Sequence, residues 1–238
     1  HTWLTLNFGA TAGTADTHSS ADGVSTGPRP HFEESLTRNQ RHTFKSRYLQ
    51  TGTMANCSDC GLPVEAHSDQ SRDGTRARCE ACTTLAEGDC PIRLAPLGRD
   101  DLELALAWRS NPKVYEYFRL QNGPLDWDEH VTWFESRPPG RYDFVIHYDD
   151  RRVGVVSIDS DDDVGIYLGD FSARGHGVAT GALDWLCERF AHRTPLFAEV
   201  NKGNDVSRQL FRRCGFRQEN IEEEWVQYRY DSPSTSSH

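Results

Sequence analysis

The sequence predicts an α/β (mixed α+β) fold, in which a mixed sheet is flanked by helices and preceded by a small cysteine-rich module. Short apolar or alternating runs recur along residues 91–230 and indicate strands, and runs with apolar residues three or four positions apart indicate helices between them. Two Cys-x-x-Cys pairs upstream of that region indicate the separate module. We therefore expect two folded units of unequal size.

The same patterns give the order of the elements. We expect a strand at 92–97, helices at 99–109 and from 126, strands at 142–148, 153–158 and 164–169, a helix from 178, a strand at 196–200, a helix after 204, and one or two strands over 222–230. Two of the helices should bury the following apolar stripes: Trp127, Val131 and Phe134 in one, and Val206, Leu210 and Cys214 in the other.

A glycine-bearing loop at residues 173–180 joins an apolar strand to a helix. Gly175 and Gly177 let the backbone approach a ligand closely, and free N–H groups at the positive end of the helix dipole favour a phosphate. The loop lacks the Gly-Lys-Ser/Thr ending of nucleoside-triphosphate loops and the Gly-x-Gly-x-x-Gly of dinucleotide sites. Taken alone, it is also compatible with a glycine turn that merely starts a helix.

Two motifs connect the loop to a known family. Arg174-x-x-Gly177-x-Ala179 resembles the pyrophosphate loop of the GCN5-related N-acetyltransferases (GNAT family), and residues 201–216 resemble that family's later Asn-x-x-Asn-x-x-Ser-x-x-Leu-Tyr-x-x-x-Gly-Phe motif. The resemblance covers residues 91–230. It implies a sheet splayed at its centre, acetyl-CoA as co-substrate and acetyl transfer to a primary amine. The cofactor-binding residues that it implies are Leu168, Gly169, Arg174, Gly175, His176, Gly177, Val178, Ala179, Thr180, Asn204, Ser207 and Phe211.

Three further motifs are similar to a narrower group, the N-acetyltransferases of the pseudaminic acid pathway, which acetylate the 4-amino group of a UDP-linked sugar. They are Trp-Arg-Ser-Asn-Pro at 108–112, Asp-Glu-His at 128–130 and Gly-Ile-Tyr-Leu-Gly at 165–169, with Ser110 and Asp128 departing from the group's pattern. The resemblance implies that Arg109 and His130 face the acceptor. The alternatives are an exposed helix-end arginine and a solvated helix histidine. Ribosomal-protein N-terminal acetyltransferases share much of this skeleton.

The expected reaction is attack of an uncharged amine on the thioester, and it needs a base, a stabilised carbonyl and an acid for the leaving thiolate. Candidate bases are Glu199, Asp159 and His130, and the backbone N–H groups at Leu168 and Gly169 are expected to stabilise the carbonyl. Many relatives have a tyrosine where this chain has Phe211. Either Tyr167 supplies the proton, or the thiolate leaves unaided, or activity is lost.

The two cysteine pairs, Cys57 with Cys60 and Cys79 with Cys82, have the spacing of a zinc ribbon. Two tight knuckles would aim four thiolates at one Zn²⁺ and leave no open position, so we expect a structural zinc that folds the module. His67 is a possible competing ligand, and Cys90 lies outside the pairs. The module is a candidate surface for a protein partner.

Composition and charge limit which partners and which cellular location we expect. The net charge of −10 argues against nucleic acid as a partner, and no apolar stretch reaches the length of a membrane span. Paired cysteines that bind metal, together with acetyl-CoA, favour a cytoplasmic protein. The expected divisions are a disordered or non-native leader at 1–53, a zinc-ribbon-like module at 54–88, an N-acetyltransferase domain at 91–230 and a disordered tail at 231–238.

Three functions remain open at this point. The first is acetylation of a small-molecule amine, such as one on a nucleotide-linked amino sugar. The second is acetylation of a protein N-terminus or lysine, with the ribbon recruiting the substrate. The third is a CoA-binding adaptor without turnover, which only Phe211 supports. A deep polar pocket that includes Arg109 and His130 would favour the first, and an open acidic groove would favour the second.

Overall fold

The structure, a computed structural model, describes residues 55–64 and 78–232. The leader expected at 1–53, His67 and most of the expected C-terminal tail lie outside the described residues. The strands are β1 (Ala55–Asn56), β2 (Pro63–Val64), β3 (Ile92–Pro96), β4 (Tyr142–Tyr148), β5 (Arg151–Ile158), β6 (Val164–Leu168), β7 (Leu196–Asn201), β8 (Arg217–Glu222) and β9 (Trp225–Tyr230). The α-helices are α2 (Glu80–Glu87), α3 (Leu102–Arg109), α4 (Pro112–Tyr115), α5 (Trp127–Glu135), α6 (Val178–Arg189) and α7 (Asp205–Arg213). Short 3₁₀ turns are η2 (Arg99–Asp101), η3 (Phe171–Ala173) and η4 (Ala191–Arg193).

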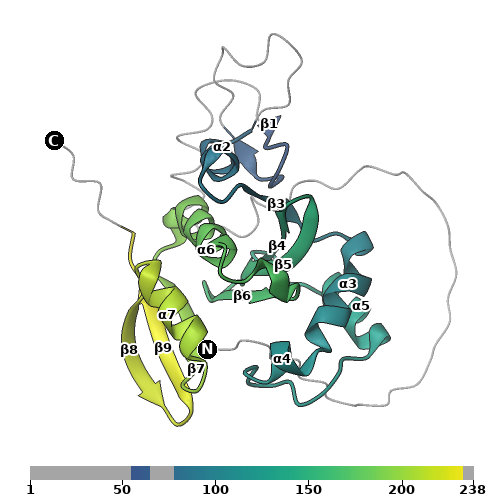
Figure 1. Cartoon of the computed structure of the whole chain (residues 1–238), viewed down its shortest axis with the longest axis vertical. Helices are drawn as coiled ribbons and strands as arrows, with labels where there is room; N and C mark the ends of the chain where they lie inside the picture. The colour runs from purple at the N-terminus through teal and green to yellow at the C-terminus, as the bar shows by residue number, and fades with distance from the viewer. Residues whose placement is uncertain (1–54, 65–77, 233–238) are drawn as a thin grey trace, which may run out of the picture.

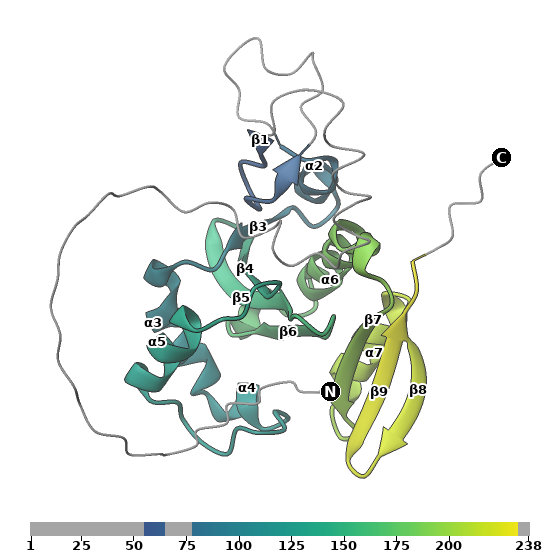
Figure 2. The ribbon, with the colours of Figure 1, turned by 180° about the vertical axis from the view of Figure 1, so that it is seen from behind.

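The strands of the larger domain form two sheets that meet at one point. Strands β3, β4, β5 and β6 form an antiparallel sheet in that order, and β7, β9 and β8 form a second one (Figure 1). A single parallel bridge between Asp163 and Phe197 joins the start of β6 to the start of β7. Beyond this bridge the two strands have no ladder, and the second sheet lies to one side of β6 (Figure 2). The expected mixed sheet, splayed at its centre, is confirmed.

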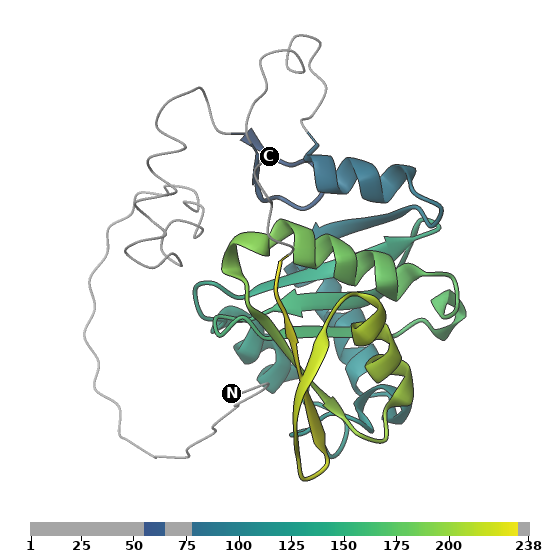
Figure 3. The ribbon, with the colours of Figure 1, turned by 90° about the vertical axis from the view of Figure 1, so that its left-hand side faces the viewer.

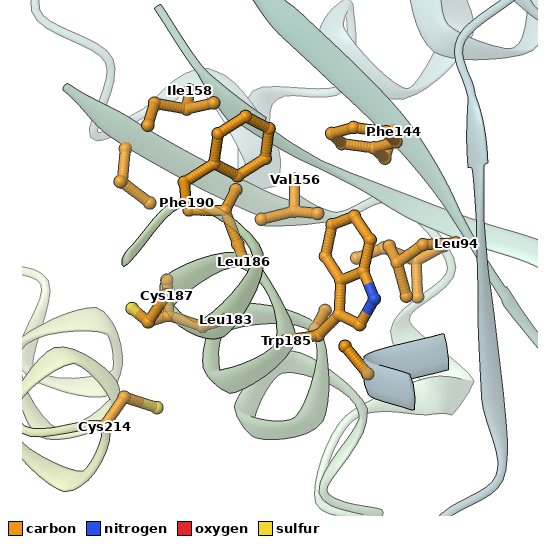
Figure 4. Close-up of a cluster of buried hydrophobic side chains, with 14 of the residues drawn as sticks. Leu94, Phe144, Val156, Ile158, Leu183, Trp185, Leu186, Cys187, Phe190 and Cys214 are labelled. Carbon is orange, nitrogen blue, oxygen red and sulfur yellow. The ribbon is translucent and has the colours of Figure 1, made fainter. Parts of the chain in front are cut away.

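Helices cover both faces of the four-stranded sheet. Helix α6 lies on one face and α3 and α5 lie on the other, as a side view shows (Figure 3). On the α6 face, Trp185 and Phe190 pack against strand residues such as Phe144 (Figure 4). On the opposite face, Leu102 and Ala105 of α3 pack against Val145 and Val155 of the strands. The sheet is therefore buried on both sides, which explains why β4 and β5 read as nearly continuous apolar runs.

The two predicted helix stripes pack against the core at Val131, Phe134, Leu210 and Cys214, but the first residue of each stripe is exposed. In α5, Trp127 is 46% exposed, whereas His130 is buried. In α7, Val206 is 79% exposed, and the buried residue of the helix is Phe211. Phe211 is buried and Val206 is not, because a phenylalanine ring removes more apolar surface from water than a valine side chain.

The C-terminal strands begin earlier than predicted. Strand β8 at 217–222 pairs antiparallel with β9 at 225–230, so residue 222 ends the first strand instead of starting the last one. Every side chain of β8 is exposed, and its sequence is almost wholly polar. Because no apolar alternation marks such an edge strand, its start cannot be located from a periodic pattern.

The cysteine module is also built differently from the prediction of two knuckles. The first pair lies in the β1–β2 hairpin, where Gly61 has a φ of +69° and its N–H donates to the Cys57 carbonyl at 3.0 Å. The second pair lies at the start of a helix, because Cys79 is the N-cap of α2 and Cys82 lies in its first turn. One knuckle and one helix end therefore supply the four thiols.

Gly169 lies directly under the indole of Trp108. A Cβ at Gly169 would stand 2.0 Å from Cγ of Trp108, so Gly169→Ala must push the indole or the strand end away. We expect the variant to lose about 1–3 kcal/mol of unfolding free energy, as overpacking typically costs. Urea unfolding followed by circular dichroism measures this loss.

The matched control is Gly123→Ala. A Cβ at Gly123 meets nothing within 4 Å, so this variant should unfold like the parent chain. Equal stability of the two variants would show that the Gly169–Trp108 contact is not a tight one.

Candidate functional site

The loop before α6 has the geometry expected of an anion-binding helix start. Gly175 and Gly177 have φ values of +80° and +83°, and Gly177 is the N-cap of α6. The first bond within the helix runs from the Gly181 N–H to the Gly177 carbonyl, at 2.9 Å. The N–H groups of residues 178–180 precede that bond and point out of the helix end, so they are free to bind an anion.

A groove of about 590 Å³ runs along this loop. It takes in nine of the residues expected to bind the cofactor: Leu168, Arg174, Gly175, Gly177, Val178, Ala179, Thr180, Asn204 and Ser207. His176 and Gly169 do not line it, and Phe211 lines a neighbouring cavity instead. Asn204 also caps α7, since its side chain accepts a hydrogen bond from the Ser207 N–H at 3.1 Å.

The neighbouring cavity, of about 140 Å³, lies where β6 and β7 diverge. The four residues predicted for catalysis and acceptor binding line it together, although they come from α3, α5, β6 and β7: Arg109, His130, Tyr167 and Glu199. The cavity and the groove share Ile166 and Tyr167 on one side and Asn204 and Ser207 on the other. Tyr167 therefore stands where the two spaces meet.

Arg109 is a buried cation. It is 7% exposed, and its Nη2 donates to Oε1 of Gln121 at 3.1 Å, while Nε2 of Gln121 donates to the Arg109 carbonyl at 2.7 Å. Its guanidinium lies over the Phe118 ring, with Cζ 5.5 Å from the centroid. Within the described ranges Arg109 has no carboxylate within 4.0 Å, and its buried Nε has no hydrogen-bond partner. The alternative of an exposed helix-end arginine is wrong, and the spare donor can hold an acceptor atom of a ligand.

His130 is a buried neutral imidazole. It is 3% exposed, its ring stacks on Trp133 with centroids 5.4 Å apart, and its Nε2 has no hydrogen-bond partner among the residues that the structure describes. Burial, with the nearby Arg109 charge, lowers the pKa of His130 to about 4, although a hydrogen bond with the Leu102 backbone opposes the shift. The alternative of a solvated histidine is wrong. At neutral pH its unpartnered Nε2 is available to a ligand in the cavity.

The other acid and base candidates differ in their protonation, ion pairs and hydrogen bonds. Burial raises the pKa of Tyr167, so its hydroxyl keeps its proton at neutral pH. The Glu199 carboxylate is paired with Arg119, with Oε1 and Nη1 2.6 Å apart. Asp159 lines neither space and uses its Oδ1 to accept the N–H groups of Asp161 and Asp163, so it is removed as a candidate base.

One of the two backbone N–H groups that we expected to stabilise the thioester carbonyl is already hydrogen-bonded. The Gly169 N–H donates to the Val153 carbonyl at 2.9 Å, so the role predicted for that N–H is wrong. Leu168 lines the groove, and its role stays a prediction.

Sequence reasoning missed Asp143 and its arginines. Asp143 lines the cavity and accepts hydrogen bonds from Arg137 at 3.0 Å and from Arg141 at 2.9 Å. A signal was available, because a lone aspartate interrupts an otherwise apolar strand. A buried carboxylate in a strand needs charged partners, and such groups gather at sites.

The four paired cysteines form a compact buried cluster. Their Sγ atoms all lie within 4.8 Å of one another, and those of Cys60 and Cys79 are 4.0 Å apart. Tetrahedral zinc with bonds of about 2.3 Å would place its sulfurs roughly 3.8 Å apart, so the residues fit a four-thiolate zinc site. N–H donors also reach two sulfurs, from Cys79 to Cys57 and from Trp185 to Cys82, each at 3.3 Å.

Among residues 55–64 and 78–232, no helix combines the length and apolar character that crossing a membrane requires.

Comparison with known proteins places residues 92–217 in one family model, described as an acetyltransferase (GNAT) domain. A curated uncharacterized protein of Methanocaldococcus jannaschii is 33% identical over 163 residues, which cover 61% of this chain and 32% of that protein. This chain thus spans about a third of that relative's length. The crystal structure of a domain from the same organism superposes with a TM-score of 0.55 at 30% identity, covering 59% of this chain and 98% of that one.

Two more distant solved structures share the fold. The microcin C7 self-immunity acetyltransferase MccE, in complex with acetyl-CoA and AMP, has a TM-score of 0.51 at 19% identity and covers 60% of this chain and 93% of its own. AAC(6')-Ib, bound to an aminoglycoside and acetyl-CoA, has a TM-score of 0.52 at 12% identity and covers 61% and 98%.

The burial of His130 predicts a pH dependence of stability. The unfolded chain binds a proton on this imidazole near pH 6.5 and the folded chain only near pH 4, so the stability linked to neutral His130 is complete above pH 6.5 and is lost as the pH falls toward 4. We expect the difference in unfolding free energy between the parent chain and His130→Gln to shrink by about 2 kcal/mol between pH 7.5 and pH 5.

Chemical denaturation of both proteins at each pH measures this difference. The contribution of carboxylates to the pH dependence is the same in both proteins and cancels in the difference. A difference that stays constant with pH would mean that His130 titrates as it does in the unfolded chain.

Proposed function

We propose that the acceptor is a primary amine on a small molecule, namely the 4-amino group of a nucleotide-linked amino sugar. The chain belongs to the GNAT acetyltransferase family, and its domain is an acetyl-CoA-dependent N-acetyltransferase. The observation that carries this proposal is the cavity between β6 and β7. Its buried Arg109 and His130 each keep one nitrogen without a partner. Unpartnered buried polar atoms are costly, so they indicate a ligand that completes them.

The groove at the start of α6 is the proposed place for the pyrophosphate of acetyl-CoA. The free N–H groups of residues 178–180 would bind its oxygens, and Gly175 and Gly177 keep side chains out of the way. Arg174 adds a positive charge at the same loop. The groove leads to Tyr167, so we place the thioester end there.

Arg109 and His130 are proposed to hold the acceptor, not to take its proton. An imidazole with a pKa of about 4 is a weak base toward an ammonium group, whereas its Nε2 is a good hydrogen-bond acceptor. Arg109 presents a fixed positive charge that suits a phosphate oxygen of a nucleotide. We assign proton removal to Glu199, whose carboxylate lines the cavity and could act on the amine directly or through a water.

Tyr167 is the proposed acid for the leaving thiolate. Its hydroxyl is protonated at neutral pH, and its side chain borders both the groove and the cavity. Phe211 cannot serve, because its ring is buried against Phe216 and Tyr228 and carries no proton to donate. This assignment favours an active enzyme over an adaptor.

The lining of the cavity supports a small-molecule acceptor over a protein substrate. An open acidic groove would suit a peptide, but this space is narrow, and Arg109, Arg119 and Arg141 line it. The size of about 140 Å³ admits the amine-bearing part of an acceptor, with the rest of the molecule at the mouth.

We also propose that residues 54–88 form a zinc module. Four buried thiols that converge within 4.8 Å repel one another as thiolates, and Zn²⁺ offsets that repulsion and replaces the core that so short a segment lacks.

An acceptor panel tests the proposed function. The full chain is incubated with acetyl-CoA and a UDP-linked 4-amino-6-deoxy sugar, a free amino sugar or N-terminal peptides, and products are measured by mass spectrometry. We expect acetylation of the UDP-sugar. Arg109→Gln should raise the KM for this acceptor at least about ten-fold, since a charged hydrogen bond contributes about 1.5–3 kcal/mol. Acetylated peptides with an unchanged sugar would contradict the proposal.

Removing the Tyr167 hydroxyl tests the acid. We expect Tyr167→Phe to lower kcat at least about ten-fold, because a positioned acid contributes that much or more, while the dissociation constant of acetyl-CoA stays unchanged. Tyr115→Phe, which removes a hydroxyl outside both the groove and the cavity, is the matched control and should keep the parental kcat. A Tyr167→Phe enzyme with the parental kcat would show that the thiolate leaves without an acid.

A further inference from the structure

The cysteine module and helix α6 share one continuous core. The four clustered cysteines belong to the same buried group as Ala182, Trp185 and Leu186 of α6. The side view shows α2 beside both α6 and the edge strand β3 (Figure 3). The helix that begins at the acetyl-CoA loop is therefore packed against the sheet and also against the module.

Trp185 connects the cysteine cluster to the sheet. Its indole Nε1 donates to Sγ of Cys82 at 3.3 Å, and the other side of its ring meets Phe144 edge to face, with centroids 4.9 Å apart (Figure 4). The indole is buried, and Cys82 is one of the four proposed zinc ligands. A hydrogen bond to a ligand sulfur orients that ligand and strengthens metal binding.

A second contact ties the other half of the module to the same helix. Nη2 of Arg189, at the end of α6, donates to the carbonyl of Pro63 in β2 at 3.2 Å. Both the hairpin with Cys57 and Cys60 and the helix with Cys82 therefore depend on α6 for part of their packing.

Leu85 of the module, together with Cys90 and Ile92 of the segment that follows it, covers the first turns of α6. A Cβ at Gly181 would lie 3.4 Å from Cδ1 of Leu85 in α2 and 3.4 Å from Cδ1 of Ile92, and a Cβ at Gly177 would lie 3.6 Å from Cβ of Cys90. These contacts reach the turn whose free N–H groups face the groove. Movement of α2 would therefore change the packing around the loop itself.

We propose that the metal-loaded cysteine module positions α6 for acetyl-CoA, with Trp185 and Arg189 as the positioning residues. The inference rests on the proposed zinc site and the proposed pyrophosphate loop. Without the metal, the short hairpin and α2 lose their cross-link, so α6 loses the support of its contacts with the module. Since the effect is thermodynamic, zinc strengthens acetyl-CoA binding and acetyl-CoA strengthens zinc binding by the same factor.

The first experiment measures both directions on the full chain. Acetyl-CoA is titrated calorimetrically into zinc-loaded and chelator-stripped protein, and zinc is competed against a chelating dye with and without saturating acetyl-CoA. We expect the dissociation constant of acetyl-CoA to rise at least about five-fold on zinc removal, and the zinc affinity to rise by the same factor with acetyl-CoA present.

The second experiment uses Trp185→Phe, which keeps an aromatic ring and removes the N–H donor. We expect zinc affinity to fall about ten-fold or more, as loss of a ligand's outer hydrogen bond typically causes. At limiting zinc, the KM for acetyl-CoA should rise while kcat is unchanged, and excess zinc should restore the KM. A merely structural role would not show this rescue. Trp127→Phe, at an exposed tryptophan on α5, is the matched control.

Each contrary outcome has a distinct meaning. Acetyl-CoA binding that is equally tight with and without zinc overturns the positioning role and leaves the proposed function intact. A chain that binds acetyl-CoA but no zinc overturns the inference and the zinc site together. A zinc-loaded chain that does not bind acetyl-CoA overturns the proposed function as well.

Discussion

The parallel bridge between Asp163 and Phe197 is the constraint on which the site depends. It joins the residue before β6 to the second residue of β7, and the two strands then diverge without pairing with each other. Strands that stay paired leave no room between them, whereas strands that diverge expose edges and inward side chains. Here the opening holds Tyr167 from one strand and Glu199 from the other. The α6 crossover that connects these strands also carries the proposed coenzyme loop, so a single topological feature brings together that loop, the proposed acid and the proposed base.

Burial then determines the chemistry of the groups around this opening. His130 stays neutral and Tyr167 stays protonated, because each charged form would lose its hydration. Arg109 keeps its charge, is hydrogen-bonded to Gln121 and lies over Phe118, with no carboxylate of the described residues within 4.0 Å. Asp143, in contrast, is neutralised by two arginines. The cavity thus offers one uncompensated cation and one free imidazole nitrogen, and both are recognition features, not features of a preformed acid–base pair.

Local patterns predicted those parts of the fold that local interactions determine. Strand β4 has the predicted bounds of 142–148, and the loop at 173–180 starts a helix as its glycines indicate. The patterns failed where tertiary packing decides. Val206 matched the helical period but lies in solvent, and the polar strand β8 exists because β9 pairs with it. Likewise, the meeting of Arg109 with His130 depends on the packing of α3 against α5, which no spacing within one helix reveals.

Binding of acetyl-CoA to a Gly177 variant tests the central claim most directly. Gly177 has a φ of +83°, where a β-branched side chain is strained, so the backbone at the start of the anion site must shift to accept one. Calorimetric titration of acetyl-CoA into Gly177→Val should show binding weakened at least about a hundred-fold, with circular dichroism unchanged, because the displaced N–H groups no longer reach the pyrophosphate. Gly123→Val, in open space, should bind like the parent chain. Parental affinity in Gly177→Val would contradict the assignment of this loop as the acetyl-CoA site.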